Sequence, residues 1–264
     1  MNIEDKHLVY FSATYTTRKV VRAVAERLPG KIHEYDITAV EPPDDVAFSG
    51  SGDLVVVGVP VYAGRVPVMA ADSLLRFRGK GTPAIAVCVY GNRAYDDALL
   101  ELSDLLGDLG FSVVAAGAFI ARHSIFTSIA SGRPDMADMA SIARFGDACA
   151  GLLASLQSVD GLVPPKVPGN RPYKEPGAVP IYPSGSRKKC DHCELCVRLC
   201  PVHAISPSRP TRTDGSICMS CGRCVEICPQ HTRCFSGILY KVAYRKLAKL
   251  CRERKEPEWY LSGD

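Results

Sequence analysis

The chain has 264 residues, with 47% hydrophobic residues, 23% charged residues and a formal net charge of +4. This length allows one medium domain and one small one. The longest nearly uncharged apolar stretch, residues 54–64, is too short for a membrane-spanning helix of ~20 residues, and the polar, acidic start is not typical of a secretory signal. We therefore expect a cytoplasmic protein with no membrane span.

Residues 1–158 alternate between strand-like and helix-like segments. Five strands are predicted: apolar segments indicate strands at residues 8–11, 53–59, 84–90 and 112–120, and weak alternation of polar and apolar residues indicates one at residues 31–37. Helical spacing of apolar residues predicts helices at residues 16–28, 66–77, 95–109 and 134–156. This alternation predicts an α/β fold with a doubly wound, five-stranded parallel sheet. Its binding site is expected in the loops that follow the carboxyl ends of the strands.

Residues 159–186 have a different composition from the segments on either side. Residues 160–186 hold seven prolines and four glycines, which excludes a helix or a central strand. Scattered apolar residues such as Val163 and Ile181 favour an extended strap that lies along the first domain. Beyond it we expect a small cysteine-rich domain at residues 187–236 and a basic amphipathic helix with a tail at residues 237–264.

Two cysteine runs in the small domain have the same spacing, C-x-x-C-x-x-C-x-x-x-C-P. The first run occupies residues 190–201 and the second residues 218–229. In such runs three thiolates hold one [4Fe–4S] cluster, and the fourth cysteine reaches the other cluster. One cluster is predicted to use Cys190, Cys193, Cys196 and Cys228. The other is predicted to use Cys218, Cys221, Cys224 and Cys200.

Zinc binding and ligation by histidine are the alternatives to this interpretation. Paired C-x-x-C motifs also bind zinc, but a zinc site needs four ligands and no third cysteine at this spacing. His192, His203 and His231 lie among the cysteines, although the eight thiols already supply eight ligands. Cys234 and Cys251 fall outside the pattern, and the isolated Cys88 and Cys149 are typical of buried thiols.

Three loops at the expected sheet edge carry polar and aromatic residues. The first holds Ser12, Thr14, Thr16 and Thr17 before a helix, an arrangement that suits a phosphate group. The second holds Pro60, Tyr62 and Gly64, and the third holds Tyr90, Gly91, Asn92 and Tyr95. Aromatic rings beside glycines and backbone amides can stack on an isoalloxazine ring and hydrogen-bond it. A flavodoxin-like scaffold without a flavin is the simpler alternative.

These motifs resemble known families. Residues 187–235 resemble bacterial two-cluster ferredoxins, and residues 8–235 resemble the flavodoxin–ferredoxin fusion proteins of anaerobic bacteria and archaea. The resemblance implies an FMN phosphate on Ser12, Thr14, Thr16 and Thr17, with the ring near the second and third loops. His123, Ser124 and residues 132–135 also match the family pattern. Tyr15 departs from it, because flavodoxin-type loops usually have Gly at this place, and a side chain there limits positive φ angles.

The favoured function is electron transfer between FMN, two [4Fe–4S] clusters and a redox partner protein, with no side chain acting as a nucleophile or general base. One alternative is a flavin-dependent reductase whose anionic substrate meets Arg65, Arg93, Arg122 and His123. Another is a redox or iron sensor that signals through the basic tail. The basic residues after position 187 offset the negative clusters, so nucleic acid is not an expected partner. Whether the cofactors meet within one chain or across a homodimer stays open.

Overall fold

The computed structural model describes residues 1–39, 45–48, 52–177 and 179–263, so Asp264 at the end of the predicted tail lies outside it. Its main sheet has six strands in the order β10-β7-β6-β4-β1-β2. The strands are β1 (Asp5–Tyr10), β2 (Lys31–Asp36), β4 (Asp53–Pro60), β6 (Thr82–Tyr90), β7 (Phe111–Ile120) and β10 (Glu258–Leu261). The five parallel strands have the order 2-1-3-4-5 in the sheet, which is the flavodoxin-like arrangement.

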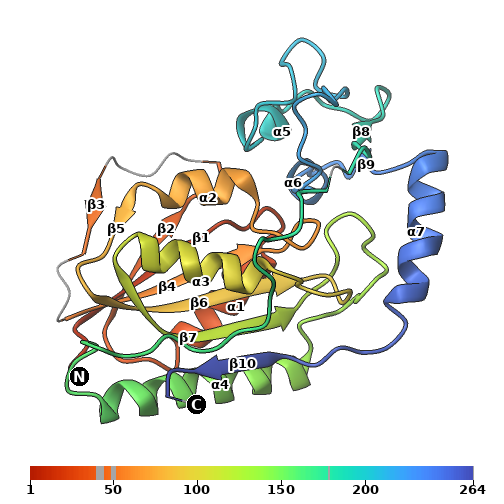
Figure 1. Cartoon of the computed structure of the whole chain (residues 1–264). Helices are drawn as coiled ribbons and strands as arrows, with labels where there is room; N and C mark the ends of the chain where they lie inside the picture. Colours follow the sequence, from red (N-terminus) through yellow and green to blue (C-terminus); the bar gives the residue numbers. More distant parts are fainter. Residues whose placement is uncertain (40–44, 49–51, 178, 264) are drawn as a thin grey trace.

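Helices cover both faces of this sheet (Figure 1). One face packs against α1 (Thr16–Ala25) and α4 (Met136–Ser155), and the other packs against α2 (Val68–Leu74) and α3 (Ala98–Asp108). Alternate residues of β4 enter the two cores, as Val55 and Val56 do. A strand buried on both faces needs a continuous apolar run, which explains why the sequence pattern predicted these strands.

The remaining elements are short or lie towards the end of the chain. Two small sheets pair β3 (Val46–Ala47) with β5 (Phe77–Arg78) and β8 (Ser184–Gly185) with β9 (Arg233–Cys234). Each cysteine run contains one helical turn, α5 (Leu195–Arg198) in the first and α6 (Arg223–Glu226) in the second. The basic helix α7 (Ile238–Leu250) lies within residues 237–264, where the sequence predicted a basic helix and a tail. No described helix is long and apolar enough to cross a membrane.

The strap at residues 159–186 runs across α3 before it reaches the cysteine-rich module. The Asp97 carboxylate accepts hydrogen bonds from the backbone N–H groups of Asn170 (2.9 Å) and Lys174 (2.7 Å). Asp104 pairs with Arg171 at 2.6 Å. Asp97, directly before α3, and Asp104 within it therefore hold residues 170–174 of this proline-rich segment against the surface of the first domain.

The strand β10 was not predicted, and it changes the expected five-stranded sheet into a six-stranded one. It pairs antiparallel with β7, so that Glu258 lies opposite Ala118 and Leu261 opposite Ala115. The chain thus returns to the first domain after the cysteine-rich module (Figure 1). The pairing covers the outer edge of β7, which would otherwise present unpaired backbone groups.

Candidate functional site

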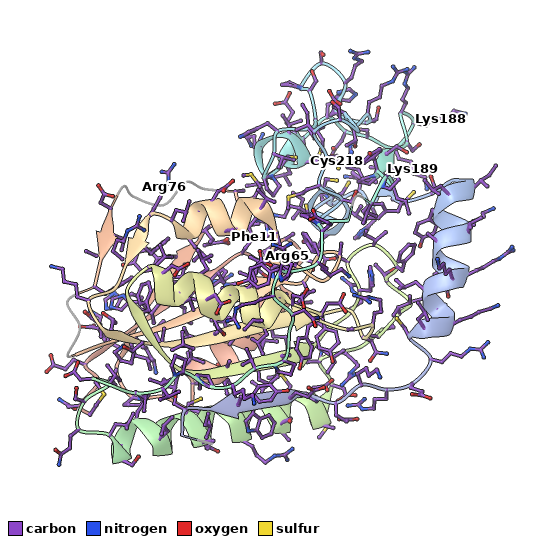
Figure 2. All side chains as sticks on the ribbon, in the orientation of Figure 1. Phe11, Arg65, Arg76, Lys188, Lys189 and Cys218 are labelled. Atoms are coloured by element: carbon purple, nitrogen blue, oxygen red, sulfur yellow. The ribbon has the colours of Figure 1, made fainter. Side chains whose placement is uncertain are left out.

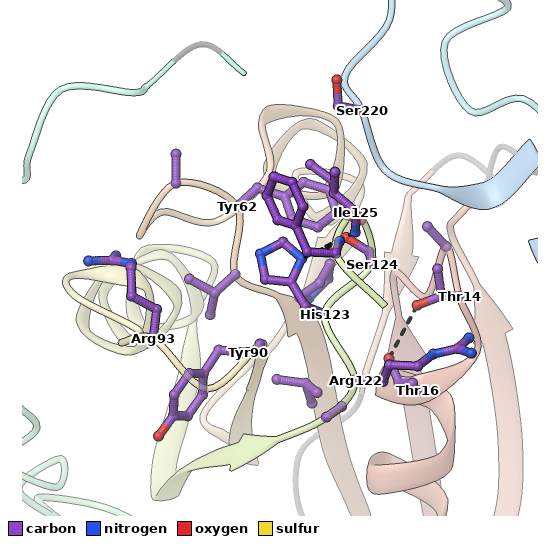
Figure 3. A pocket seen from close by; sticks show the side chains of 18 of the residues that line it. Thr14, Thr16, Tyr62, Tyr90, Arg93, Arg122, His123, Ser124, Ile125 and Ser220 are labelled. Atoms are coloured by element: carbon purple, nitrogen blue, oxygen red, sulfur yellow. Dashed lines mark hydrogen bonds between the residues drawn. The ribbon is translucent and has the colours of Figure 1, made fainter. Parts of the chain in front are cut away.

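A cavity opens where β1, β4, β6 and β7 end, and the predicted loops form much of its wall. Eight of the residues predicted to bind FMN line it: Thr14, Thr16, Thr17, Pro60, Tyr62, Gly64, Tyr90 and Gly91. Figure 3 shows Thr14 and Thr16 on one side, Tyr62 and Tyr90 on the other, and His123 between them. The parallel sheet therefore brings together residues that lie far apart in the sequence.

The loop after β1 has the chemistry of an anion site. The Thr14 and Thr16 hydroxyl oxygens lie 3.4 Å apart and both face the cavity. The first N–H groups of α1 have no partner within the helix, and the helix dipole adds partial positive charge there. Ser12 stabilises this loop, because its Oγ accepts a hydrogen bond from the backbone N–H of Arg18 at 3.0 Å.

Tyr15 does not crowd this site. Its φ of 62° is left-handed, which is the conformation that a glycine would adopt more readily at this position. Its side chain is 42% exposed and lies outside the cavity, where the Arg223 guanidinium stacks over its ring at 4.7 Å. The departure from the family pattern therefore coincides with a contact between the first domain and the cysteine-rich module.

The aromatic wall consists of Tyr62 and Tyr90. Burial raises the pKa of Tyr62 well above its usual value, and the nearby Cys221 thiol adds to this effect. Burial likewise raises the pKa of Tyr90, whose ring meets Tyr95 edge-on at 5.5 Å. Both phenols are therefore neutral donors at physiological pH, and they offer aromatic faces rather than charges to a ligand.

Three predicted residues, Ser12, Asn92 and Tyr95, do not line the cavity. The Asn92 amide instead donates to the backbone oxygens of Cys251 (3.0 Å) and Glu253 (2.9 Å). The Tyr95 hydroxyl donates to Glu258 at 2.7 Å, at the start of β10. Asn92 and Tyr95 thus bind the C-terminal segment that returns to the first domain, rather than lining the cavity.

His123 is placed in the cavity wall by the loop after β7. Its Nδ1 accepts hydrogen bonds from the backbone N–H groups of Ile125 (3.1 Å) and Phe126 (3.3 Å), so the ring proton is on Nε2. Burial lowers the pKa of His123 to about 4, so the ring is neutral. The ring lies against Gly91, where a Cβ would come within 2.7 Å of Cδ2. His123 is therefore a fixed, uncharged hydrogen-bond donor.

The cavity has a cover that the sequence did not reveal. The strap contributes Val179, the second cysteine run contributes Met219 and Ser220, and α7 contributes Leu247. The Ser220 hydroxyl donates to the backbone oxygen of Ile181 at 2.8 Å, which ties the run to the strap. All three C-terminal segments thus meet over the site of the first domain.

The eight cysteines of the two runs lie around two small cavities. The first cavity is lined by Cys200, Cys218, Cys221 and Cys224, which we call the inner group. The second is lined by Cys190, Cys193, Cys196 and Cys228, which we call the outer group. Each group combines three cysteines of one run with the fourth cysteine of the other. Among the described residues, no group of three or more Cys, His, Asp or Glu side chains is arranged so that it could hold a single metal ion.

The inner group lies against the cavity of the first domain. Cys221 belongs to the same packed core as Tyr62, and the neighbouring Met219 and Ser220 line the cavity directly. At Gly222, with a φ of 81°, an added Cβ would lie only 2.9 Å from the Ser124 backbone oxygen. The absence of a side chain at Gly222 therefore permits this close approach of the two domains.

Arg223 fixes the same interface. It is 6% exposed and donates to the backbone oxygens of Ser12 (3.2 Å) and Ala13 (3.5 Å) in the loop after β1. At the rim, Arg122 pairs with Glu226 of α6 at 2.6 Å. The cavity loops and the second cysteine run are thus joined by contacts to the backbone as well as between side chains.

Comparisons with known proteins give one family match and several structural similarities. Residues 189–232 match the family described as 4Fe-4S dicluster domain. A search of curated proteins finds no match. Among solved structures, rubredoxin oxygen:oxidoreductase from the anaerobe Desulfovibrio gigas is similar at 15% identity, with 60% of this chain and 38% of that chain covered and a TM-score of 0.41. A flavodoxin from the domain Archaea is similar at 12% identity, with 57% and 99% covered and a TM-score of 0.38.

The strand order gives the first domain a flavodoxin-like fold, and the family match makes residues 189–232 a dicluster domain, which implies two [4Fe–4S] clusters. Together the two domains suggest electron transfer. The donor set of the cavity also fits FMN: hydroxyls and helix N–H groups suit the phosphate, and Tyr62, Tyr90 and His123 suit a planar, hydrogen-bonding ring.

Proposed function

We propose that this chain relays electrons between FMN, bound in the cavity of the flavodoxin-like domain, two [4Fe–4S] clusters and a redox partner protein. The observation that carries the proposal is the contact of the inner cysteine group with the cavity. Cys221 packs in one core with Tyr62, and Met219 and Ser220 cover the site. A cluster held by the inner group would therefore adjoin a bound flavin within a single chain.

Burial supports an order for the centres. Cys200, Cys221 and Cys224 of the inner group are buried, whereas Cys193 of the outer group is exposed. A partner protein can approach the outer group most closely, while the inner group is enclosed between it and the cavity. The proposed path therefore runs from the cavity through the inner group to the outer group, and a partner docks at the surface around Cys193.

The bound cofactors supply the redox chemistry, since a flavin exchanges electrons in pairs or singly and each cluster exchanges one. The chain's own residues position them and exclude water. The loop after β1 holds an anion, and His123 presents its Nε2–H in a single tautomer. Burial around the inner group lowers the local polarity, which is one way that a protein sets a cluster potential.

The charges at the site favour a relay over a reductase with an anionic substrate. Arg65 pairs with Glu101 at 2.7 Å and does not line the cavity. Arg93 and Arg122 do line it, but they pair with Asp96 and Glu226. The cations considered for substrate binding are therefore already engaged. Turnover of a small substrate without any partner protein would overturn this argument.

The first test is the cofactor content of protein purified without oxygen. We expect about eight irons, eight acid-labile sulfides and one FMN per chain. Clusters without bound flavin after incubation with FMN would contradict the relay, and zinc without sulfide would contradict both centres.

The second test asks whether transfer occurs within one chain. The protein is reduced by a substoichiometric pulse of a one-electron donor, and redistribution between flavin and clusters is followed by absorbance. A first-order rate that is independent of protein concentration is expected, because the inner group and the cavity belong to the same chain. A rate that rises in proportion to concentration would show that the centres meet between chains, which contradicts the proposed path.

A further inference from the structure

The segments that follow the two cysteine runs differ in charge at one buried position. The fifth residue after the last cysteine is Ile205 in the first case and Arg233 in the second. Both are almost fully buried, with 3% and 4% of their surface exposed. Ile205 packs among apolar atoms near Cys200 and Cys224, as expected of a core residue. The second segment places a guanidinium group where the first places a hydrocarbon side chain.

Arg233 has only neutral partners. Its terminal nitrogens donate to the backbone oxygens of Pro183 (3.2 Å) and Pro210 and to the Thr213 hydroxyl. Its Nε has no hydrogen-bond partner, and no Asp or Glu in the described parts of the chain forms an ion pair with it. A buried cation is costly unless negative charge lies nearby, so its burial calls for an anion that the polypeptide's carboxylates do not supply.

The position of Arg233 relates it to both cysteine groups. Arg233 and its acceptor Pro210 line the cavity of the outer group. Its other partners, Pro183 and Thr213, line the cavity of the inner group. The residue lies on β9, which pairs with β8 where the strap enters the cysteine-rich module (Figure 1). The guanidinium is thus held by atoms from the walls of both cavities.

Two other cations of the cysteine-rich module lie at its surface. Figure 2 marks Cys218 in the module, together with Lys188 and Lys189. These two lysines are exposed, so solvent screens their charges far more than that of Arg233.

We propose that Arg233 is a shared counter-cation that raises the reduction potentials of both clusters. The proposal rests on the relay function, because it assumes clusters on both cysteine groups. Each cluster gains one electron and one unit of negative charge on reduction, with no bond made or broken. A fixed positive charge between the two groups favours the reduced form of each, and low local polarity strengthens the effect. Arg233 is in this sense a positioning residue for charge rather than a ligand.

The test is a redox titration of the anaerobically purified holoprotein, monitored by the electron paramagnetic resonance of the reduced clusters. In Arg233→Gln, which keeps hydrogen-bonding groups but loses the charge, the equilibrium constant for reduction should fall about tenfold for both clusters, equal to about 59 mV each. Arg233→Lys should keep both potentials near those of the wild type. Arg198→Gln is the matched control, since Arg198 is exposed and donates to the Cys193 backbone oxygen at 3.2 Å.

The outcomes separate this proposal from the relay itself. Unchanged potentials in Arg233→Gln with full iron content would overturn it, and so would a shift of one potential alone. If Arg233→Gln loses iron, the iron contents of Arg233→Lys, which keeps the charge, and Arg233→Met, which lacks it, are compared instead. Equal iron loss in these two variants would show that Arg233 has a purely structural role and would overturn the proposal. Absence of clusters from the wild type would instead overturn the relay function on which the proposal rests.

Discussion

The two cysteine runs share a backbone conformation but face different surroundings. Positive φ angles recur at matching positions, 60° at His192 and 57° at Ser220, then 59° at Glu194 and 81° at Gly222. His192 is exposed, whereas Ser220 is buried and donates to backbone oxygens of the strap. Thus the repeat is preserved in its turns, while the side chains at those turns differ.

The differences follow from which run touches the flavodoxin-like domain. Glu194 is half-buried and carries a side chain, but its counterpart Gly222 lies too close to Ser124 to carry one. The next position is Leu195 in the first run and Arg223 in the second, where the guanidinium reaches the loop after β1. A duplicated metal-binding unit can therefore become asymmetric through a few contact residues, with one run adapted to a domain interface and the other to solvent.

Substituting the two equivalent turn residues by alanine should separate the runs most clearly. Gly222→Ala places a Cβ 2.9 Å from the Ser124 oxygen at a φ of 81°, and we expect a loss of about 1–3 kcal/mol in unfolding free energy. Glu194 already carries a Cβ at a φ of 59°, so Glu194→Ala should change the unfolding free energy by less than about 0.5 kcal/mol. Urea unfolding of the holoproteins measures both values. Equal losses would show that the interface imposes no special demand on the second run.

Arg223→Leu gives the second run the residue of the first. It leaves the Ser12 and Ala13 backbone oxygens without this donor and removes the stacking on Tyr15, so we expect a loss of about 1–2 kcal/mol. FMN should also bind more weakly, because the loop that faces its phosphate loses a support. Fluorescence titration with FMN measures this effect. Undiminished FMN affinity together with unchanged unfolding free energy would contradict the role given to Arg223.

The pH dependence of the unfolding free energy tests the state of His123, in the loop after β7 that contacts the second cysteine run. The folded protein keeps His123 neutral down to a pKa of about 4, whereas the unfolded chain binds a proton below about 6.5. The unfolded state therefore binds more protons in this range, and stability falls with falling pH. Between pH 7 and 5.5 this group alone should contribute about 1 kcal/mol, a slope that His123→Gln removes. Urea unfolding of both proteins at the two pH values measures it, and parallel pH profiles would contradict the buried neutral ring.

The smallest effect is expected for Tyr15→Gly. Glycine adopts the observed φ of 62° more easily, by about 1 kcal/mol, but it loses a cation–π contact of about 0.5–1 kcal/mol. These contributions nearly cancel, and FMN affinity should stay within about twofold because the ring lies outside the cavity. A tenfold gain in FMN affinity, measured by the same fluorescence titration, would show instead that Tyr15 crowds the phosphate.

The sequence predicted those features that depend on regular spacing. Buried parallel strands such as Asp53–Pro60 are apolar runs, and the spacing of the cysteine runs predicted the two groups of four thiols that line the two small cavities. The strand Glu258–Leu261 has only four residues and no periodicity, so nothing in the local pattern distinguished it from a tail. Pattern alone could not show that the chain would return to β7.

The same long-range contact explains why two of the predicted site residues do not line the cavity. Asn92 and Tyr95 are in a loop at the correct edge of the sheet, but the returning segment occupies them from more than a hundred residues away. Conversely, Met219 of the second cysteine run and Leu247 of α7 cover the cavity, although neither belongs to the three loops predicted to form it. A sequence pattern identifies the loops of such a site, whereas its cover depends on how the domains pack.

The strand β10 makes the dicluster module an insertion within one continuous sheet domain rather than an appendage on a linker. Both of its connections are anchored, one by the strap on α3 and the other by the pairing of β10 with β7. A module anchored at both ends cannot diffuse freely on a linker. Its local concentration at the cavity of the flavodoxin-like domain is therefore set by the fold rather than by linker length. The outer cysteine group is correspondingly kept on the far side of the inner group, at the surface where the proposed redox partner would dock.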